Sequence, residues 1–150
     1  MSQEMYKHDA LLHLLWAVAI ADSTSDDQKY GSVSSLEDEY YERVKKAEGI
    51  NISFSEIADK RKELRESIGT EGIITEALKA TNGCSREWRA KVVCYMIIMA
   101  NKSWEGEYLD SGKKMNISDN EYAIYNKARE YFRLTEEEEE RGWESIRNSN

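Results

Sequence analysis

Residues 11–22 read LLHLLWAVAIAD, and their apolar side chains recur at helical spacing around nearly the whole circumference of a helix. A helix of this kind is expected to be buried on most faces. The longest apolar run, Ala10 to Ala21, is shorter than the roughly 20 residues needed to cross a bilayer. A second run, residues 88–102, reads WRAKVVCYMIIMANK and has the same character. We therefore predict two central helices in a helical core.

The rest of the chain predicts shorter amphipathic helices whose starts are marked by capping residues. A capping box pairs Ser or Thr with a Glu three residues later. We assign this role to Ser34 with Glu37, Ser118 with Glu121, and Thr135 with Glu138. Further helix starts are expected at Ser2, Ser53, Thr70 and Ser85, and helix ends at Gly49 and Gly83. The chain contains no proline to interrupt them. The predicted fold is all-α, a compact bundle of about seven helices in one domain over residues 1–150.

Two passages of the chain match one another. A central helix ending Ala19-Ile20-Ala21-Asp22 leads through a loop to Val33-Ser34-x-x-Glu37. Later, a helix ending Ile98-Met99-Ala100-Asn101 leads through a longer loop to Ile117-Ser118-x-x-Glu121. Internal similarity of this kind is the mark of a repeated structural unit. We expect two pseudo-repeated helix-loop-helix units.

The charge balance bears on the class of partner. There are 29 acidic and 21 basic residues, giving a net charge of -8, and the basic residues are scattered along the chain. Nucleic-acid binding depends on clustered Lys and Arg, so a nucleic-acid partner is not expected. An anionic membrane surface would repel the chain. Cations or a basic protein face are the expected partners.

The cysteines and histidines suggest no catalytic or zinc site. Cys84 and Cys94 stand ten residues apart and form no metal or redox motif, and Cys94 lies within an apolar run. Free thiols of this kind favour the reducing cytoplasm. His8 and His13 point to different faces of one helix, and we expect one to be at the surface and the other in the core.

Acidic residues at the two repeated units suggest a cation site. Asp26 precedes Glu37 by eleven residues and Asp110 precedes Glu121 by eleven, which are the end positions of a calcium-binding loop. The intermediate positions do not follow that pattern, so a looser set of oxygens is the alternative. Its members in the first unit are Asp22, Asp26 or Asp27 with Glu37. The structural alternative, which the residue pattern taken alone favours, is that Glu37 and Glu121 only close capping boxes.

The pattern Ala19-Ile20-Ala21-Asp22, followed by Gly31-Ser32-Val33-Ser34-Ser35-Leu36-Glu37, resembles the repeated acidic motif of the TerB-like family of tellurite-resistance helical proteins. The second copy is Ala100-Asn101 with Ile117-Ser118-Asp119-Asn120-Glu121. The resemblance extends from about Leu11 to Leu134. It implies an all-helical, non-enzymatic, bacterial stress-response protein whose paired acidic motifs bind a divalent cation, with calcium as the first candidate.

Carried over residue by residue, the resemblance nominates Asp22 and Glu37 in the first motif, and Asn101 and Glu121 in the second. Ser23 and Lys102 stand where the family motif has glycine, and Asn101 stands where it has aspartate. The amide of Asn101 still offers a carbonyl oxygen, but the second site has lost a charge. It is expected to bind a cation less tightly than the first.

Two functions of different class remain open on the sequence. The first is the metal-binding, non-catalytic module just described. The second is an acidic interaction module that needs no metal and docks a protein partner. Trp104 and Tyr108 are the candidate partner-binding residues, because they form an aromatic pair in a polar loop, although packing of that loop onto the helices is the alternative. A hydrolytic enzyme would need a nucleophile or a phosphate-binding loop, and the sequence suggests neither.

Overall fold

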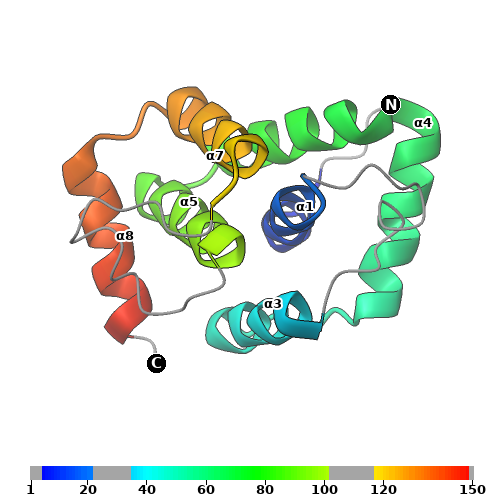
Figure 1. Cartoon of the computed structure of the whole chain (residues 1–150), viewed down its shortest axis with the longest axis horizontal. Coiled ribbons are helices and arrows are strands. Elements are labelled where there is room, and N and C mark those ends of the chain that lie inside the picture. The colour runs from blue at the N-terminus through cyan, green and yellow to red at the C-terminus, as the bar shows by residue number, and fades with distance from the viewer. Residues whose placement is uncertain (1–4, 22–34, 102–116, 149–150) are drawn as a thin grey trace.

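The computed structural model describes residues 5–21, 35–101 and 117–148, and within these ranges the chain is all-helical, with no strand (Figure 1). The six helices are α1 (Lys7–Ala19), α3 (Ser35–Glu48), α4 (Phe54–Asn82), α5 (Arg86–Asn101), α7 (Asp119–Phe132) and α8 (Glu136–Asn148). The predicted all-α fold is confirmed. The structure has six helices in the described ranges where about seven were expected.

Helices α1 and α5 form the centre of the bundle, as their apolar circumference predicts. All residues from Ala10 to Val18 and from Val92 to Ala100 are buried. Helix α1 packs against α4, α5, α7 and α3, and α5 packs in addition against α8 (Figure 1). The described residues form one hydrophobic core cluster to which all six helices contribute.

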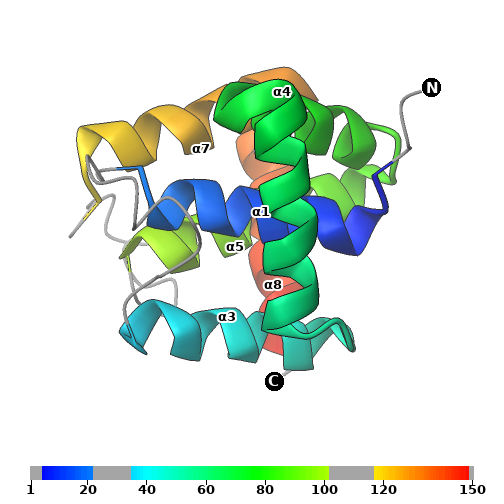
Figure 2. The same ribbon diagram turned by 90° about the vertical axis from the view of Figure 1, so that its right-hand side faces the viewer.

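Helix α4 consists of two helical parts that meet at Gly69, where the sequence predicted a boundary between two helices. The two helices expected after Ser53 and after Thr70 are parts of this single element, which bends at Gly69 (Figures 1 and 2). Gly69 has φ 72° and ψ 174°, a conformation that is essentially restricted to glycine. The chain therefore changes direction at one residue, with helical residues directly on both sides and no connecting loop.

Most predicted helix starts are confirmed by their hydrogen bonds. The Ser53 and Ser118 hydroxyls accept the backbone N–H groups of Glu56 and Glu121, each at 3.1 Å. The Ser85 hydroxyl accepts the Trp88 N–H at 3.1 Å, and the Thr135 hydroxyl accepts the Glu138 N–H at 3.2 Å. Each bond satisfies a donor that the first helical turn leaves without a partner. Ser2 and Ser34 lie outside the described residues.

The first helix begins later than predicted. Met5 and Tyr6 are not helical, and α1 starts at Lys7 with Tyr6 at the cap position in an extended conformation. The side chain of Tyr6 makes no capping hydrogen bond, and it is 60% exposed. The apolar periodicity predicted the body of this helix correctly and its start incorrectly.

Helices α5 and α8 approach one another closely. A Cβ atom added to Gly142 would lie 3.0 Å from the backbone carbon and oxygen of Ala90, so the absence of a side chain allows the contact. Trp143 and Ile146 of α8 are buried in the core, as their spacing predicts. None of the helices in the described ranges is long and apolar enough to span a membrane.

Candidate functional site

The helices that flank the two matching passages of the sequence share one end of the molecule. Helices α1 and α5 both end there, and α3 and α7 both begin there, on the left-hand side of Figure 2. These four helix ends are the ones that border the acidic residues nominated as cation ligands. The convergence is a consequence of α1 and α5 packing together at the centre of the bundle.

Among the nominated ligands, the structure describes the side chain of Glu121 alone. Glu37 stands in the first turn of α3, and Asn101 is the last residue of α5. The remaining predicted residues lie outside the described ranges: Asp22, Asp26, Asp27, Asp110, Trp104 and Tyr108. Their assignment as ligands or as partner-binding residues stays a prediction.

Glu121 closes the predicted capping box. Its Oε1 accepts the backbone N–H of Ser118 at 2.9 Å, and the Ser118 hydroxyl accepts the Glu121 N–H at 3.1 Å. The side chain is 5% exposed. The helix start thus gives the Glu121 carboxylate a structural role that requires no cation. Within the described part of the chain, no group of three or more His, Cys, Asp or Glu side chains is arranged to hold a metal ion.

A polar cluster that the sequence did not suggest lies between α1, α3 and α4. We call it the Arg61 centre, and it consists of Arg61, Tyr41, Trp16 and His13. Arg61 is only 5% exposed, and its Nη2 donates to the Tyr41 hydroxyl at 3.1 Å. The Tyr41 hydroxyl donates in turn to the Leu12 carbonyl at 3.1 Å. The guanidinium carbon of Arg61 lies 4.8 Å from the centre of the Trp16 ring.

The positive charge of Arg61 is incompletely compensated. Among the described residues no carboxylate forms an ion pair with it, and the nearby Asp9 is paired with Lys60 at 3.1 Å. Burial lowers the pKa of Arg61, while the hydrogen bond to Tyr41 opposes that shift. A buried charge costs several kcal/mol, and a desolvated cation–π contact returns about 2 kcal/mol. The Nε–H of Arg61 has no hydrogen-bond partner among the described residues.

His13 and Trp16 leave further nitrogens without partners in the same cluster. His13 is 1% exposed, which confirms it as the core histidine, and its Nδ1 has no hydrogen-bond partner. Burial, followed by the positive charges of Arg61 and Lys60, lowers the pKa of His13 to about 3. The Nε1–H of Trp16 is also buried without a partner. The imidazole of His13 is therefore neutral beside the Arg61 guanidinium, which forms no ion pair with a described residue.

A sequence signal for the Arg61 centre does exist. Ile57 and Leu64 set the apolar stripe of the first part of α4, and Arg61 falls on that same stripe at helical spacing. Its neighbours Lys60 and Lys62 make the segment resemble a solvated charged face. A basic residue on a buried stripe is the feature that marks it.

The predicted surface histidine, His8, is half-buried and belongs to an aromatic contact between α1 and α5. Its ring centre lies 5.1 Å from that of Tyr6 and 5.8 Å from that of Trp88. The ammonium groups of Lys7 and Lys91 lie 4.8 and 5.7 Å from the Trp88 ring. Burial and then Lys7 lower the pKa of His8. These contacts hold the first turn of α1 against α5.

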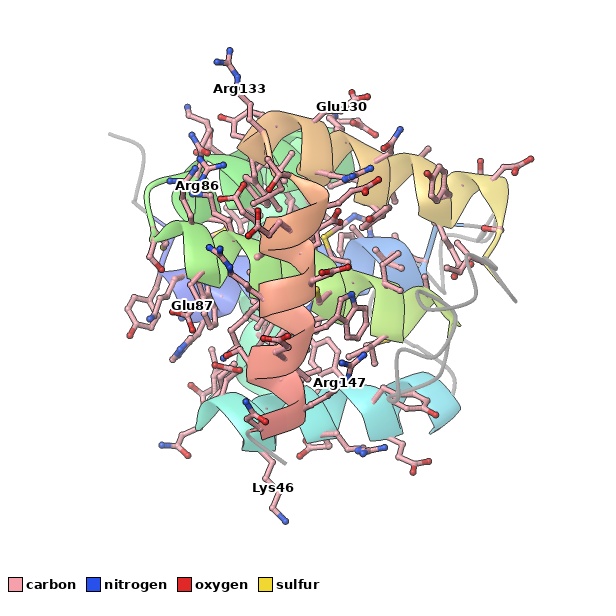
Figure 3. The ribbon with its side chains drawn as sticks, turned by 90° about the vertical axis from the view of Figure 1, so that its left-hand side faces the viewer. Lys46, Arg86, Glu87, Glu130, Arg133 and Arg147 are labelled. Carbon is pink, nitrogen blue, oxygen red and sulfur yellow. The ribbon has the colours of Figure 1, made fainter. Side chains whose placement is uncertain are left out.

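A pocket of about 320 Å³ lies beside the contact of α5 with α8. Figure 3 shows α8 crossing in front of α5, with Arg86 and Glu87 beside it. Arg86 Nη2 donates to Glu138 at 2.7 Å, and Arg141 pairs with Glu137 at 2.8 Å. The ionic side chains around this pocket thus satisfy one another, so the pocket gives no reason to expect a ligand.

Comparison of the chain with models of protein families, with curated protein sequences and with solved structures gave no match. The resemblance to the TerB-like family therefore depends on the motif residues quoted above. A function for this chain has to be argued from its own geometry.

Proposed function

We propose that this protein is a non-catalytic helical module that binds a divalent cation, with calcium as the first candidate. The cation would be held at the end of the molecule where α1 and α5 finish and α3 and α7 start. The observation that supports the proposal is that these four helix ends, which border two acidic passages far apart in sequence, lie on one side of the molecule (Figure 2).

The chemistry of the nominated residues suits a hard cation. Calcium takes six to eight oxygen ligands and tolerates irregular geometry, so one acidic motif alone supplies too few. Asp22, Glu37, Asn101 and Glu121 offer carboxylate and amide oxygens from both units. The C-terminal ends of α1 and α5 add the partial negative charge of their free carbonyl groups, which favours a nearby cation.

The TerB-like resemblance extends the proposal to a biological setting. It places the protein among tellurite-resistance and stress-response proteins of the bacterial cytoplasm, where it would act through a protein partner. Trp104 and Tyr108 are the residues proposed to contact that partner. The net charge of -8 argues for a partner with a basic face and against nucleic acid.

The test is the thermal unfolding of chelator-treated protein with calcium, magnesium or zinc added in turn. A cation that binds the folded state alone raises the unfolding midpoint in proportion to the logarithm of its concentration, once it exceeds the dissociation constant. The variants Asp22→Ala, Glu37→Gln and Glu121→Gln should reduce that rise. A cation-independent midpoint in the wild-type protein would contradict the proposal.

The Gln substitutions separate the two roles of the glutamates. Glutamine closes a capping box as glutamate does, so Glu121→Gln keeps the helix start and removes the charge that a cation needs. The matched control is Glu138→Gln, which makes the same change in the box at the start of α8. That box lies beyond the far end of α7, so the cation-induced rise should be unchanged in the control.

A metal-independent interaction module is the second candidate. The observation that favours it is the complete capping box of Ser118 and Glu121, which accounts for a buried carboxylate without a cation. This function predicts association with a basic partner that weakens as salt is added and does not respond to chelators. A midpoint that no cation shifts, together with such association, would establish it in place of the first.

A further inference from the structure

The first part of α4 buries fewer apolar side chains than the second part. Over residues 54–68, which we call the α4 strap, Ile57 and Arg61 are buried and Leu64 is partly buried. Burial of apolar side chains is the main stabilising contribution to a helix contact, so the strap gains little from packing against α1. The buried residues of the second part are Ile73, Ile74, Ala77, Leu78 and Thr81.

The contact of the strap with α1 also contains polar groups that lack partners. Arg61 is 5% exposed, and its hydrogen-bond partner Tyr41 is a neutral phenol. The Nε–H of Arg61, the Nε1–H of Trp16 and the Nδ1 atom of His13 are buried without a hydrogen-bond partner among the described residues. A charged or polar group that loses water and gains no partner destabilises the contact that buries it. Movement of the strap away from α1 would return these groups to water.

The strap is bounded by segments that allow such a movement. At one end, Gly69 has φ 72° and ψ 174°, and no atom lies within 4 Å of a Cβ built on it. Its dihedral angles can therefore change without a steric clash of a side chain. At the other end, residues 51–53 have no secondary structure and connect the strap to the buried Ile50. Figure 2 shows the strap crossing in front of α1 before the chain turns into the second part of α4.

We propose that the α4 strap opens away from α1 about Gly69 as one unit, while the rest of the bundle stays folded. Opening takes the Arg61 guanidinium into water and uncovers the side of α1 that carries His13 and Trp16. Both of these side chains are about 1% exposed in the closed structure, so the strap controls access to this side of α1. The open form is a minor species, and global unfolding in urea therefore still follows a single transition.

Hydrogen exchange of the backbone amides in the wild-type protein tests the opening and needs no variant. The exchange rate of each amide, compared with its rate in an unstructured peptide, gives an equilibrium constant for opening. Residues 58–67 should share one constant and be roughly 100-fold less protected than residues 74–82, with a weaker dependence on urea. Equal protection of the two parts would overturn the proposal. Protection that rises gradually from Phe54 toward Gly69 would also overturn it, because that pattern indicates fraying of the helix start.

The variant Arg61→Met tests whether the buried charge favours the open form. Methionine has a similar length and no charge, so the closed form should gain stability and exchange in the strap should slow about tenfold. The matched control is Lys62→Met on the exposed face of the strap, where exchange should keep the wild-type rate. Equal strap exchange in the two variants would overturn the proposal. Slower exchange confined to residues 74–82 would overturn it as well, because Arg61 would then stay buried while the strap amides exchange.

Discussion

At the scale of single residues, His13 makes the stability of the core depend on pH. Its pKa is lowered to about 3 in the folded protein and is near 6.5 in an unfolded chain. The unfolded state therefore binds the proton more readily, so stability is full above pH 6.5 and falls as the pH drops toward 3. Between pH 6.5 and pH 5, where few carboxylates titrate, the expected loss is about 2 kcal/mol.

Urea unfolding at a series of pH values measures this loss. His13→Gln should remove most of the pH dependence in that window, because glutamine does not titrate. His8→Gln is the control, since the pKa of His8 is also lowered but the side chain is half-buried. A pH dependence that disappears with His8→Gln and persists with His13→Gln would contradict the assignment.

The contact between α5 and α8 depends on another single residue, Gly142. In Gly142→Ala the added methyl would lie 3.0 Å from the backbone of Ala90, so the two helices have to move apart. The free-energy cost of overpacking is larger than the stabilisation that alanine gives over glycine in a helix. We therefore expect a net destabilisation of about 1–2 kcal/mol. Chemical unfolding gives the value.

Gly83→Ala is the matched control for that substitution. The methyl would meet the Ala80 carbonyl oxygen at 3.5 Å, an ordinary contact, and Gly83 has φ -77°. Its free energy of unfolding should stay within about 0.5 kcal/mol of the wild-type value, as for most surface substitutions. Similar losses in the two variants would show that packing against Ala90 is not the cause.

At the scale of elements, the sequence predicted helix bodies better than helix junctions. The residues of α5 and α7 show apolar periodicity and capping hydroxyls, which are local features, and both helices form where they were expected. The join at Gly69 was predicted as a boundary between helices. Local patterns predicted the helical parts on both sides of Gly69, but their relative direction depends on the packing of Ile57 and Ile73 into one core, which no local pattern contains.

The candidate sites differ in how far the sequence reveals them. Spacing predicted the capping role of Glu121, because helix starts are local. The Arg61 centre is assembled from α1, α3 and α4, so its contacts depend on tertiary packing. The helical spacing of Arg61 with Ile57 and Leu64 can be found in the sequence, but it does not identify Tyr41 and Trp16 as neighbours of Arg61.

The bend of α4 gives a prediction about an element. No atom lies within 4 Å of a Cβ built on Gly69, so the effect of Gly69→Ala comes from the backbone alone. At φ 72° and ψ 174° an alanine is strained, and the expected destabilisation is about 1–3 kcal/mol. The measurement is urea unfolding monitored by circular dichroism. A stabilised variant would mean that α4 straightens without penalty, which the packing of its two parts does not allow.

At the scale of the whole molecule, the arrangement of the helices explains why α1 and α5 end, and α3 and α7 begin, on the same side. Helices α1 and α5 are each apolar on most faces, and each is followed in the chain by a helix that packs against the central pair. Helix α8 then covers α5 on the side away from α4 (Figure 1). Because both central helices bury their surface against several neighbours, removing one layer exposes the others.

This mutual dependence predicts that the chain unfolds as one cooperative domain. Trp16 reports on the contact of α1 with α4, Trp88 on the start of α5, and Trp143 on the packing of α8. In three variants that each keep one of these tryptophans, with the others and Trp104 replaced by phenylalanine, the fluorescence and circular dichroism midpoints should coincide within each variant. Because both midpoints are measured on the same variant, the stability lost by the substitutions affects them equally. If Trp143 changed at a lower urea concentration than the helical signal, α8 would be a separately unfolding layer, and the pocket beside it would open before the core.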